Sequence, residues 1–332
     1  MLRVVGWAAA GFAAGLMAWR LSTDPLVRQL SPRNFDVASL TLAGVVCVAS
    51  QLLYCSRWYW FLRVSQAAIT WSEAVFAGLA AQLLAAIAVG SAGGDIYRGV
   101  VAGSRTAGHR VGIVASILAD RVAGLYSLFC VAVLAATFTP GGGRWETMRV
   151  ASMPVLWTAV VAGGAGIVAG LFLNLGPALS WTRSIPPLFR LVAPALAAVE
   201  RFRSTPGIFA LGIASGMVVH AASAAALWLV ARGLGVPHPT LAEHCLIAPL
   251  STCTALLPLP MAGLGTVELI IDGLYATAVP DSAGAGLIAA FGGRLLGFAV
   301  NASLAAAFLP LSRLRSLTRP VDRTLRGGAM EP

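Results

Sequence analysis

Long apolar stretches alternate with short polar connections along the whole chain. Most of the stretches hold about 20 residues, the length that an α-helix needs to cross the hydrocarbon core of a bilayer. The pattern therefore predicts an all-α integral membrane protein, a polytopic bundle of about eight transmembrane helices. The stretches lie at 4–21, 37–55, 71–90, 111–138, 151–175, 207–231, 241–257, 266–279 and 283–310.

Glycines and prolines interrupt the apolar pattern at two places, Ser91–Gly94 and 257–268. Glycine lets the backbone leave helical geometry, and a broken helix at membrane depth is tolerated only where protein or a water-filled cavity covers it. Interruptions at matching positions in two halves of a chain are typical of transporter binding sites. We therefore expect two broken or re-entrant segments that carry the site. The candidate glycines are Gly93, Gly94, Gly263 and Gly265.

Asp120 and Arg121 are adjacent within the apolar stretch 111–138. A charged side chain at the centre of a membrane helix costs about 2.5–3.5 kcal/mol on insertion scales, so both should face the interior of the bundle. Adjacent residues on a helix point about 100° apart. We therefore expect each of the two to find its partner on another helix.

The same spacing between an acid and an arginine occurs twice. Asp95 precedes Arg121 by 26 residues (121 − 95), and Glu268 precedes Arg294 by the same 26 (294 − 268). In both cases a glycine-rich interruption comes just before the acid, and an apolar stretch carries the arginine. This favours an internal repeat with its sites at mid-membrane. The two halves would be about 37–138 and 207–310.

Two further segments carry topology signals. Apolar residues recur at helical spacing in 186–203 with arginines on the other face, which predicts an amphipathic helix at the membrane surface. We expect 1–310 to form one transmembrane domain and 311–332 a basic tail. Arginine-rich segments favour the cytoplasmic side, so the tail is expected in the cytoplasm. The protein would be a multi-pass protein of a cell membrane, of the bacterial inner-membrane type.

Composition supports membrane residence and excludes several function classes. The 332 residues are 58% hydrophobic and 11% charged, whereas soluble domains carry about 25% charged residues. The net charge of +10 comes from arginines scattered between apolar stretches, which does not indicate a nucleic-acid partner. The 5 cysteines include no CxxC pair, so we expect no disulfide framework, no metal and no cofactor.

Two other polar features have ordinary structural interpretations. The segment Ser56–Arg63 mixes aromatic residues with arginine, which is typical of an anchor at the membrane–water interface; direct contact with lipid headgroups is the alternative. His220 lies within an apolar stretch, where a lone histidine more often makes one interhelical hydrogen bond than a proton relay.

The order of these motifs resembles the lysylphosphatidylglycerol synthase transmembrane-region family, best known from the flippase half of the multiple peptide resistance factor. The resemblance runs from about Leu53 to Leu309. It implies a helical bundle with re-entrant segments that moves lipids between leaflets. Two positions depart from the family pattern: Val267 replaces an Arg that often precedes the glutamate, and 89–92 lacks a Pro. The motifs are Gly93-Gly94-Asp95-x-x-Arg98, then Asp120-Arg121, then Ala262-Gly263-Leu264-Gly265-x-x-Glu268, then Arg294.

Three function classes follow from these observations. The first is a flippase or transporter that moves an anionic or modified lipid or glycolipid between leaflets, with the lipid as its partner. The second is an accessory or scaffold subunit of a lipid- or glycan-synthesis enzyme. The third is a membrane enzyme acting on a lipid headgroup, with Asp95 or Glu268 as general base, which would need a nucleophile or a metal that the sequence does not reveal.

Aminoacyl transfer is not expected from this chain, although the family name mentions a synthase. In full-length relatives that chemistry resembles the work of a separate soluble domain. The sequence contains no GxSxG motif, no P-loop and no lysine. We therefore expect that the protein is not an enzyme.

Overall fold

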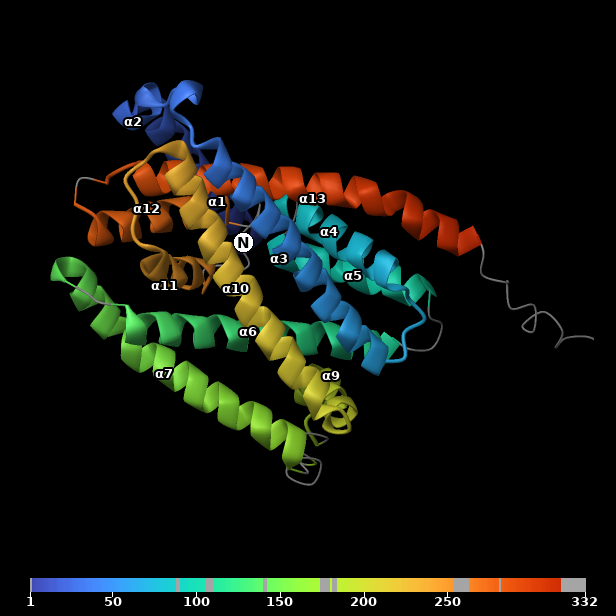
Figure 1. Cartoon of the computed structure of the whole chain (residues 1–332). Helices are drawn as coiled ribbons and strands as arrows, with labels where there is room; N and C mark the ends of the chain where they lie inside the picture. The colour runs from blue at the N-terminus through green and yellow to red at the C-terminus, as the bar shows by residue number, and fades with distance from the viewer. Residues whose placement is uncertain are drawn as a thin grey trace, which may run out of the picture.

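The computed structural model describes residues 2–87, 90–105, 110–139, 142–173, 180, 184–253, 263–280 and 282–317. Within these residues the chain is all-helical and contains no strand (Figure 1). The helices are α1 (Leu2–Thr23), α2 (Pro25–Gln29), α3 (Val37–Val64), α4 (Trp71–Ile87), α5 (Gly90–Arg105), α6 (Arg110–Phe138), α7 (Gly143–Phe172), α9 (Pro186–Arg203), α10 (Pro206–Leu234), α11 (Leu241–Thr252), α12 (Thr266–Ala278) and α13 (Ala285–Leu317), with a 3-10 turn at Pro32–Asn34.

Five helices of the described chain are long and apolar enough to cross a membrane. The 28 residues of α3 give a length of about 42 Å, well above the roughly 30 Å of a hydrocarbon core. Large apolar side chains such as Val155 and Val161 of α7 point outward, as expected of a lipid-facing surface. The helical membrane fold is confirmed. The five spans are Val37–Val64, Arg110–Phe138, Gly143–Phe172, Pro206–Leu234 and Ala285–Leu309.

The helices follow the order long, short, short, long twice along the chain. The N-terminal set comprises α3, α4, α5 and α6, and the C-terminal set comprises α10, α11, α12 and α13. The two leading long helices, α3 and α10, pack against each other more extensively than any other pair (Figure 1). The sets coincide with the predicted halves, and their descent from one repeat stays a prediction.

The first predicted interruption is wrong in its position. Ser91–Gly94 belongs to the first turns of α5, so these residues are helical; α4 ends at Ile87 and α5 begins at Gly90. The helices α4 and α5 lie side by side (Figure 1). A Cβ on Gly94 would lie 2.7 Å from the carbonyl oxygen of Ala81 in α4. Gly94 therefore permits close contact between two helices, and does not break one.

The second predicted interruption, 257–268, lies partly outside the described residues, and in its described part only 263–265 precede α12 and are not part of it. Helix α11 ends at Thr252 and α12 begins at Thr266, and residues 254–262 lie outside the described chain. Gly263 has φ +70° and Gly265 has φ +84°, conformations that other residues rarely adopt. Gly265 also lies directly against the backbone of Ala13 in α1. Both its backbone angle and its contact with α1 therefore require a glycine.

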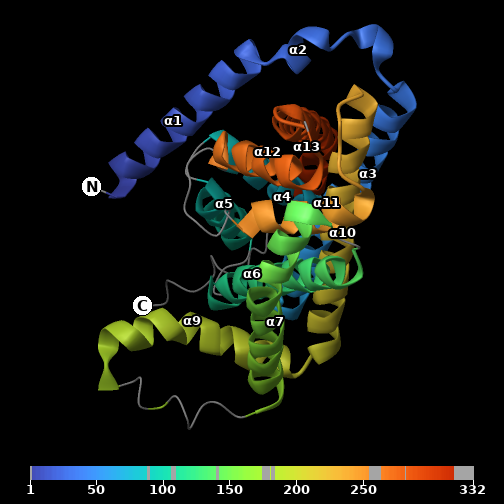
Figure 2. The same ribbon diagram turned by 90° about the vertical axis from the view of Figure 1, so that its left-hand side faces the viewer.

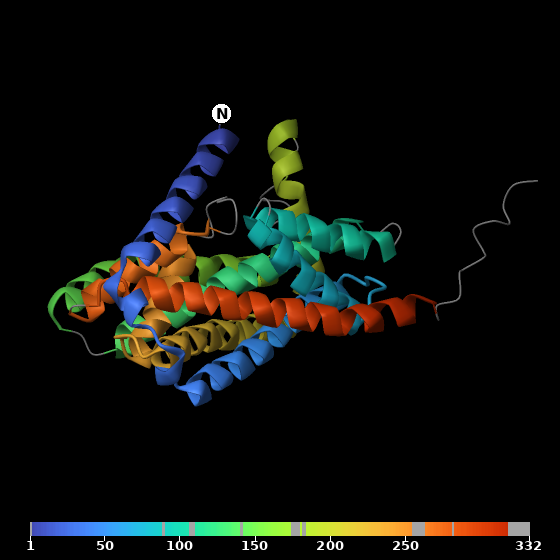
Figure 3. The ribbon, with the colours of Figure 1, turned by 90° about the horizontal axis from the view of Figure 1, so that it is seen from above.

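Two helices project from the main bundle, although Phe202 near the end of α9 is buried against α6 and α10. Helices α1 and α9 both project from the same side of it, α1 from one end and α9 from the other (Figures 2 and 3). Helix α9 has the bounds expected for the amphipathic segment, although its position at a membrane surface stays a prediction. Elsewhere α7 begins at Gly143, before the expected start at 151, and α13 continues to Leu317, into the segment expected to be a tail.

Candidate functional site

Five charged side chains from three helices form one chain of ion pairs in the N-terminal set. Asp120 of α6 lies between two arginines: Arg57 of α3 donates from Nε to Oδ1 at 2.7 Å, and Arg98 of α5 donates from Nη1 to Oδ2 at 3.2 Å. Arg98 also pairs with Asp95, one turn earlier on α5. Asp95 in turn accepts a hydrogen bond at 2.7 Å from Nε of Arg121. Positive and negative charges therefore alternate along this chain of ion pairs, which has Arg57 at one end and Arg121 at the other.

The middle of this chain of ion pairs is withdrawn from solvent. Arg98 is 2% exposed, Asp120 1% and Arg57 3%. The Arg98 guanidinium also lies 5.1 Å from the centre of the Trp58 ring and 5.9 Å from that of Tyr54, within the range of cation–π attraction. Buried charges persist only when they are paired and hydrogen-bonded. The network therefore holds α3, α5 and α6 in one arrangement.

The adjacent pair on α6 behaves as the helical geometry predicts. Asp120 is hydrogen-bonded to Arg57 and Arg98, and Arg121 is hydrogen-bonded to Asp95. Arg121 is the more accessible of the two, with 43% of its side chain exposed. The expectation that each residue pairs with another helix is confirmed.

A second acid–arginine pair joins α12 to α13. Glu268 is 1% exposed and forms an ion pair with Nε of Arg294. Its other carboxylate oxygen accepts a 2.7 Å hydrogen bond from the backbone N–H of Gly265, directly before α12 begins. This arrangement places a carboxylate at a helix N-terminus, where the helix dipole favours negative charge. The spacing of 26 residues thus corresponds to a contact in both sets of helices.

A third buried acid, Asp272, holds the start of α13. Its Oδ1 accepts hydrogen bonds from the backbone N–H groups of Gly284 at 2.9 Å and Leu287 at 3.2 Å. Its Oδ2 lies 3.4 Å from Nη1 of Arg20, which connects α1 to this region. Asp272 therefore fixes the relative positions of α12, α13 and α1.

The predicted site residues fall into two groups, one in each set of helices. The first group contains Gly93 and Gly94 near the start of α5 together with four charged residues, Asp95, Arg98, Asp120 and Arg121. The second group contains Gly263, Gly265, Glu268 and Arg294. Acid–arginine pairing joins the charged residues within each group.

Arg57 is the member of the network that sequence reasoning missed. The segment Ser56–Arg63 is not an interfacial anchor throughout, because α3 continues to Val64 and buries both Arg57 and Trp58. A signal for this role existed: Asp120 in the middle of an apolar stretch requires a cation on another helix. Arg57 follows directly on the apolar stretch 37–55 and was a candidate for that cation.

A cavity of about 260 Å³ borders the chain of ion pairs. Both terminal residues of that chain, Arg57 and Arg121, line it together with Asp120. Leucine and valine side chains form much of the remaining wall. The other polar side chains in the lining are Tyr54, His220 and Thr252.

His220 connects α10 to α6 beside the same cavity. Its Nε2 lies 3.0 Å from the carbonyl oxygen of Gly124. A carbonyl oxygen only accepts, so Nε2 is the nitrogen that carries the proton and donates. This is the single interhelical hydrogen bond expected from the sequence.

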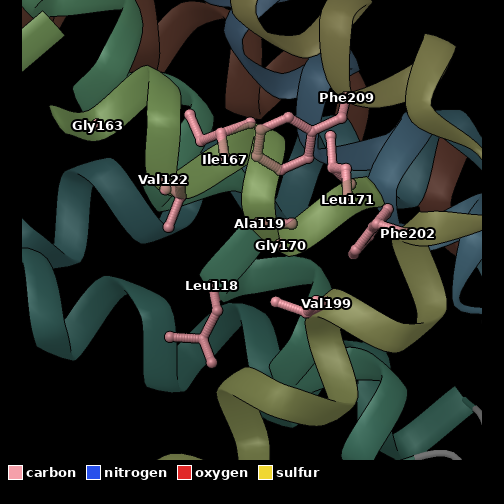
Figure 4. A pocket seen from close by; sticks show the side chains of 11 residues that line it. Leu118, Ala119, Val122, Gly163, Ile167, Gly170, Leu171, Val199, Phe202 and Phe209 are labelled. Atoms are coloured by element: carbon pink, nitrogen blue, oxygen red, sulfur yellow. The ribbon is translucent and has the colours of Figure 1, made fainter. Parts of the chain in front are cut away.

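An apolar pocket of about 330 Å³ lies on another side of α6, between α6, α7, α9 and α10 (Figure 4). Leu118 and Val122 of α6 face Phe209 of α10 across it. Gly163, Gly166 and Gly170 of α7 line it together with the side chains of Ile167 and Leu171 from the same helix. The pocket therefore offers an apolar surface of the kind that hydrocarbon fills.

Metal ligands do not gather in the described part of the chain, where no three His, Cys, Asp or Glu side chains lie close enough to hold an ion.

No curated protein and no solved structure matches the sequence. The family model for the lysylphosphatidylglycerol synthase TM region matches residues 4–311, which extends the resemblance in both directions. The motifs, the helical membrane fold and this match lead to one conclusion: the chain belongs to the lysylphosphatidylglycerol synthase transmembrane-region family.

Proposed function

We propose that the protein is a lipid flippase or transporter that moves an anionic or modified lipid between leaflets. The observation that carries the proposal is the pair of equivalent ion pairs, Asp95–Arg121 and Glu268–Arg294. Each joins a short helix to the long helix that follows it. Charged residues at membrane depth mark substrate pathways more often than they serve stability.

The short helices support a path through the bundle. Helix α5 has 16 residues and α12 has 13, which correspond to about 24 Å and about 20 Å. Neither length covers a hydrocarbon core of roughly 30 Å. We infer that the pairs α4–α5 and α11–α12 enter the membrane as re-entrant hairpins. Such segments need a protein or aqueous lining, and the gap that they leave is a route for a headgroup.

The arginines have the chemistry that a phospholipid requires. A guanidinium presents a planar fork of donors that matches carboxylate and phosphate alike. Asp95 and Glu268 accept hydrogen bonds from the Nε atoms of Arg121 and Arg294. A lipid phosphate that displaces either carboxylate would exchange one charge-assisted hydrogen bond for another. The apolar pocket beside α6 supplies a surface for an acyl chain.

A reconstituted vesicle assay tests the proposal. The full chain is placed in liposomes with a fluorescent phospholipid, and dithionite reports the fraction of label that reaches the outer leaflet. We expect Arg121→Ala and Arg294→Ala to reduce transport to the level of protein-free vesicles. Arg144→Ala is the matched control, because Arg144 is exposed at the start of α7 and should leave transport unchanged.

The outcomes separate the function classes. Equal transport by all three variants would remove the buried arginines from the site. Absence of transport by the wild-type protein, with every lipid tested, would contradict the proposal and favour an accessory subunit. Variants that fail to elute as a single species in detergent would indicate that the ion pairs serve folding, and Arg→Lys replacements would then be the comparison.

A further inference from the structure

We infer that a groove between α6, α10 and α11 binds a diacyl glycerolipid, and that the hydroxyl group of Thr139 donates a hydrogen bond to an ester carbonyl oxygen of that lipid. The three helices pack against one another (Figure 1). The groove has a volume of about 450 Å³ and shares no lining residue with the cavity beside the chain of ion pairs. The inference goes beyond the proposed function, because a lipid can bind here whether or not the protein transports it.

The walls of the groove are apolar and accessible from outside the bundle. Leu134 and Phe138 of α6 and Val218 of α10 line it with exposed side chains. Both helices are long and apolar enough to cross a membrane. No described residue in the lining is charged. Lipid tails are as apolar as leucine, so an acyl chain is the partner that a bilayer supplies to such a surface.

One polar group in this lining needs more than hydrocarbon. Thr139 is 4% exposed, and its Oγ1 has no hydrogen-bond partner among the described residues. A buried hydroxyl without a partner is unfavourable, and such groups are rare in folded proteins. Because Thr139 lines the groove, an acceptor on a bound ligand would complete its hydrogen bonding.

Thr137 shows the alternative that is open to a threonine of the same helix. Its Oγ1 donates to the carbonyl oxygen of Val133 at 2.8 Å, one turn earlier in α6. The equivalent acceptor for Thr139 is the carbonyl oxygen of Ala135, which accepts from the backbone N–H of Thr139 at 2.9 Å but not from its hydroxyl. The Thr139 hydroxyl is therefore free to donate to a ligand in the groove.

The position of Thr139 along the chain indicates which acceptor it meets. Thr139 directly follows α6, whose 29 residues correspond to about 43 Å. This length exceeds the roughly 30 Å of the hydrocarbon core, so the end of the helix lies toward a headgroup layer. Glycerolipids carry their ester carbonyls at the boundary between acyl chains and headgroups. An ester carbonyl accepts from a hydroxyl and keeps its acyl chain beside it, which matches a single donor in an apolar groove.

Photo-cross-linking with the full chain in detergent micelles tests the location of the site. The probe is a diester phosphatidylcholine with a diazirine close to the ester end of one acyl chain. This headgroup carries no net charge, so attraction to the arginines of the other cavity is small. We expect cross-linked peptides from 131–139 of α6 and 217–221 of α10, identified by mass spectrometry. Cross-links confined to other parts of the chain would overturn the inference.

A pair of matched competitors tests the hydrogen bond. Unlabelled diester phosphatidylcholine and its diether analogue have the same headgroup and chain length, but the diether has no carbonyl oxygen. We expect the diester to displace the probe from the groove at a concentration about fivefold lower, which is the effect of one neutral hydrogen bond. Equal displacement by the two lipids would overturn the assignment of the ester carbonyl.

Threonine variants assign the hydrogen bond to one residue. Thr139→Val removes the hydroxyl, keeps the shape of the side chain and should abolish the preference for the diester; Thr139→Ala serves if this variant does not fold. Thr139→Ser keeps a hydroxyl and should keep the preference. Thr137→Val is the matched control, because Thr137 is exposed, does not line the groove and has its acceptor within α6. A folded Thr139→Val protein that keeps the fivefold preference, or a Thr137→Val protein that loses it, would contradict the role of Thr139.

The cross-linking and transport assays fail independently. Specific cross-linking in the groove of a protein that moves no lipid would uphold this site and overturn the proposed function. Transport by a protein that gives no cross-link in the groove would overturn this site and leave the proposed function in place.

Discussion

The two sets of helices stabilise their buried carboxylates in different ways. In the N-terminal set, side chains neutralise side chains: Asp120 and Asp95 are surrounded by guanidinium groups from α3, α5 and α6. In the C-terminal set, backbone N–H groups stabilise the carboxylates: Glu268 accepts from Gly265 just before α12, and Asp272 of α12 accepts from Gly284 and Leu287 at the start of α13. Helix N-termini stabilise carboxylates through their dipoles.

This difference makes the two sites depend unequally on side chains. Asp120 is held by two buried guanidinium groups, whereas Glu268 has one guanidinium partner and one backbone donor. Side-chain replacements should accordingly have their largest effects in the N-terminal set.

The largest effect is expected from Asp120→Ala. The change leaves Arg57 and Arg98 buried without the carboxylate that they share. Breaking a buried ion pair from one side costs about 3–5 kcal/mol, and here two cations lose the same partner. We expect a large loss of folded protein, measured as the unfolding midpoint in detergent and as the yield of monodisperse material.

The matched change in the other set is Glu268→Ala. It removes the partner of Arg294, whose side chain is 22% exposed and retains access to water. The backbone N–H of Gly265 loses its acceptor as well, and we expect a loss of about 1–3 kcal/mol. Equal losses in the two variants would contradict the proposed difference between the sets.

Smaller losses of stability are expected when glycines are replaced by alanine. For these variants the larger loss should occur in the C-terminal set. Gly265→Ala forces a side chain onto a residue with φ +84°, which costs about 1–2 kcal/mol before the clash with Ala13 of α1 is counted. Gly94→Ala has no strained backbone angle and only its contact with Ala81 to relieve. Thermal unfolding should place Gly265→Ala below Gly94→Ala.

Gly103 provides the control for both glycine variants. It lies on α5 like Gly94, but a Cβ at this position meets nothing within 4 Å. Gly103→Ala should leave the midpoint unchanged or raise it slightly, because alanine is the better helix former. A drop equal to that of Gly94→Ala would show that helix propensity, and not contact with α4, decides the result.

The sequence predicted the fold class, the interhelical partners of Asp120 and Arg121 and the non-helical backbone at Gly263 and Gly265 for identifiable physical reasons. These features can be recognised in the sequence itself. They are apolar stretches of membrane length, charges that cannot lie in lipid and a fixed spacing of 26 residues. The helical state of Ser91–Gly94 was not predictable in this way, because small residues both end helices and permit close packing. Gly94 serves the second purpose.

Arg57 was missed for a related reason. Its neighbours are aromatic, and aromatic residues beside an arginine are found both at membrane interfaces and around buried cations. Only the tertiary arrangement, in which Asp120 of α6 meets α3, separates these cases. The cavity between α3, α6 and α10 likewise depends on contacts between residues far apart in the chain.

The smallest effect is expected from Arg20→Ala. Arg20 lies 3.4 Å from Asp272, but half of its side chain is exposed, at 52%. Exposed ion pairs contribute about 0.2–1 kcal/mol, and Asp272 keeps both backbone donors from the start of α13. We expect the midpoint to fall by no more than this range, with transport retained. A loss as large as that of Asp120→Ala would mean that the C-terminal set also depends on side-chain cations, because backbone N–H groups alone would then be insufficient to hold its carboxylates.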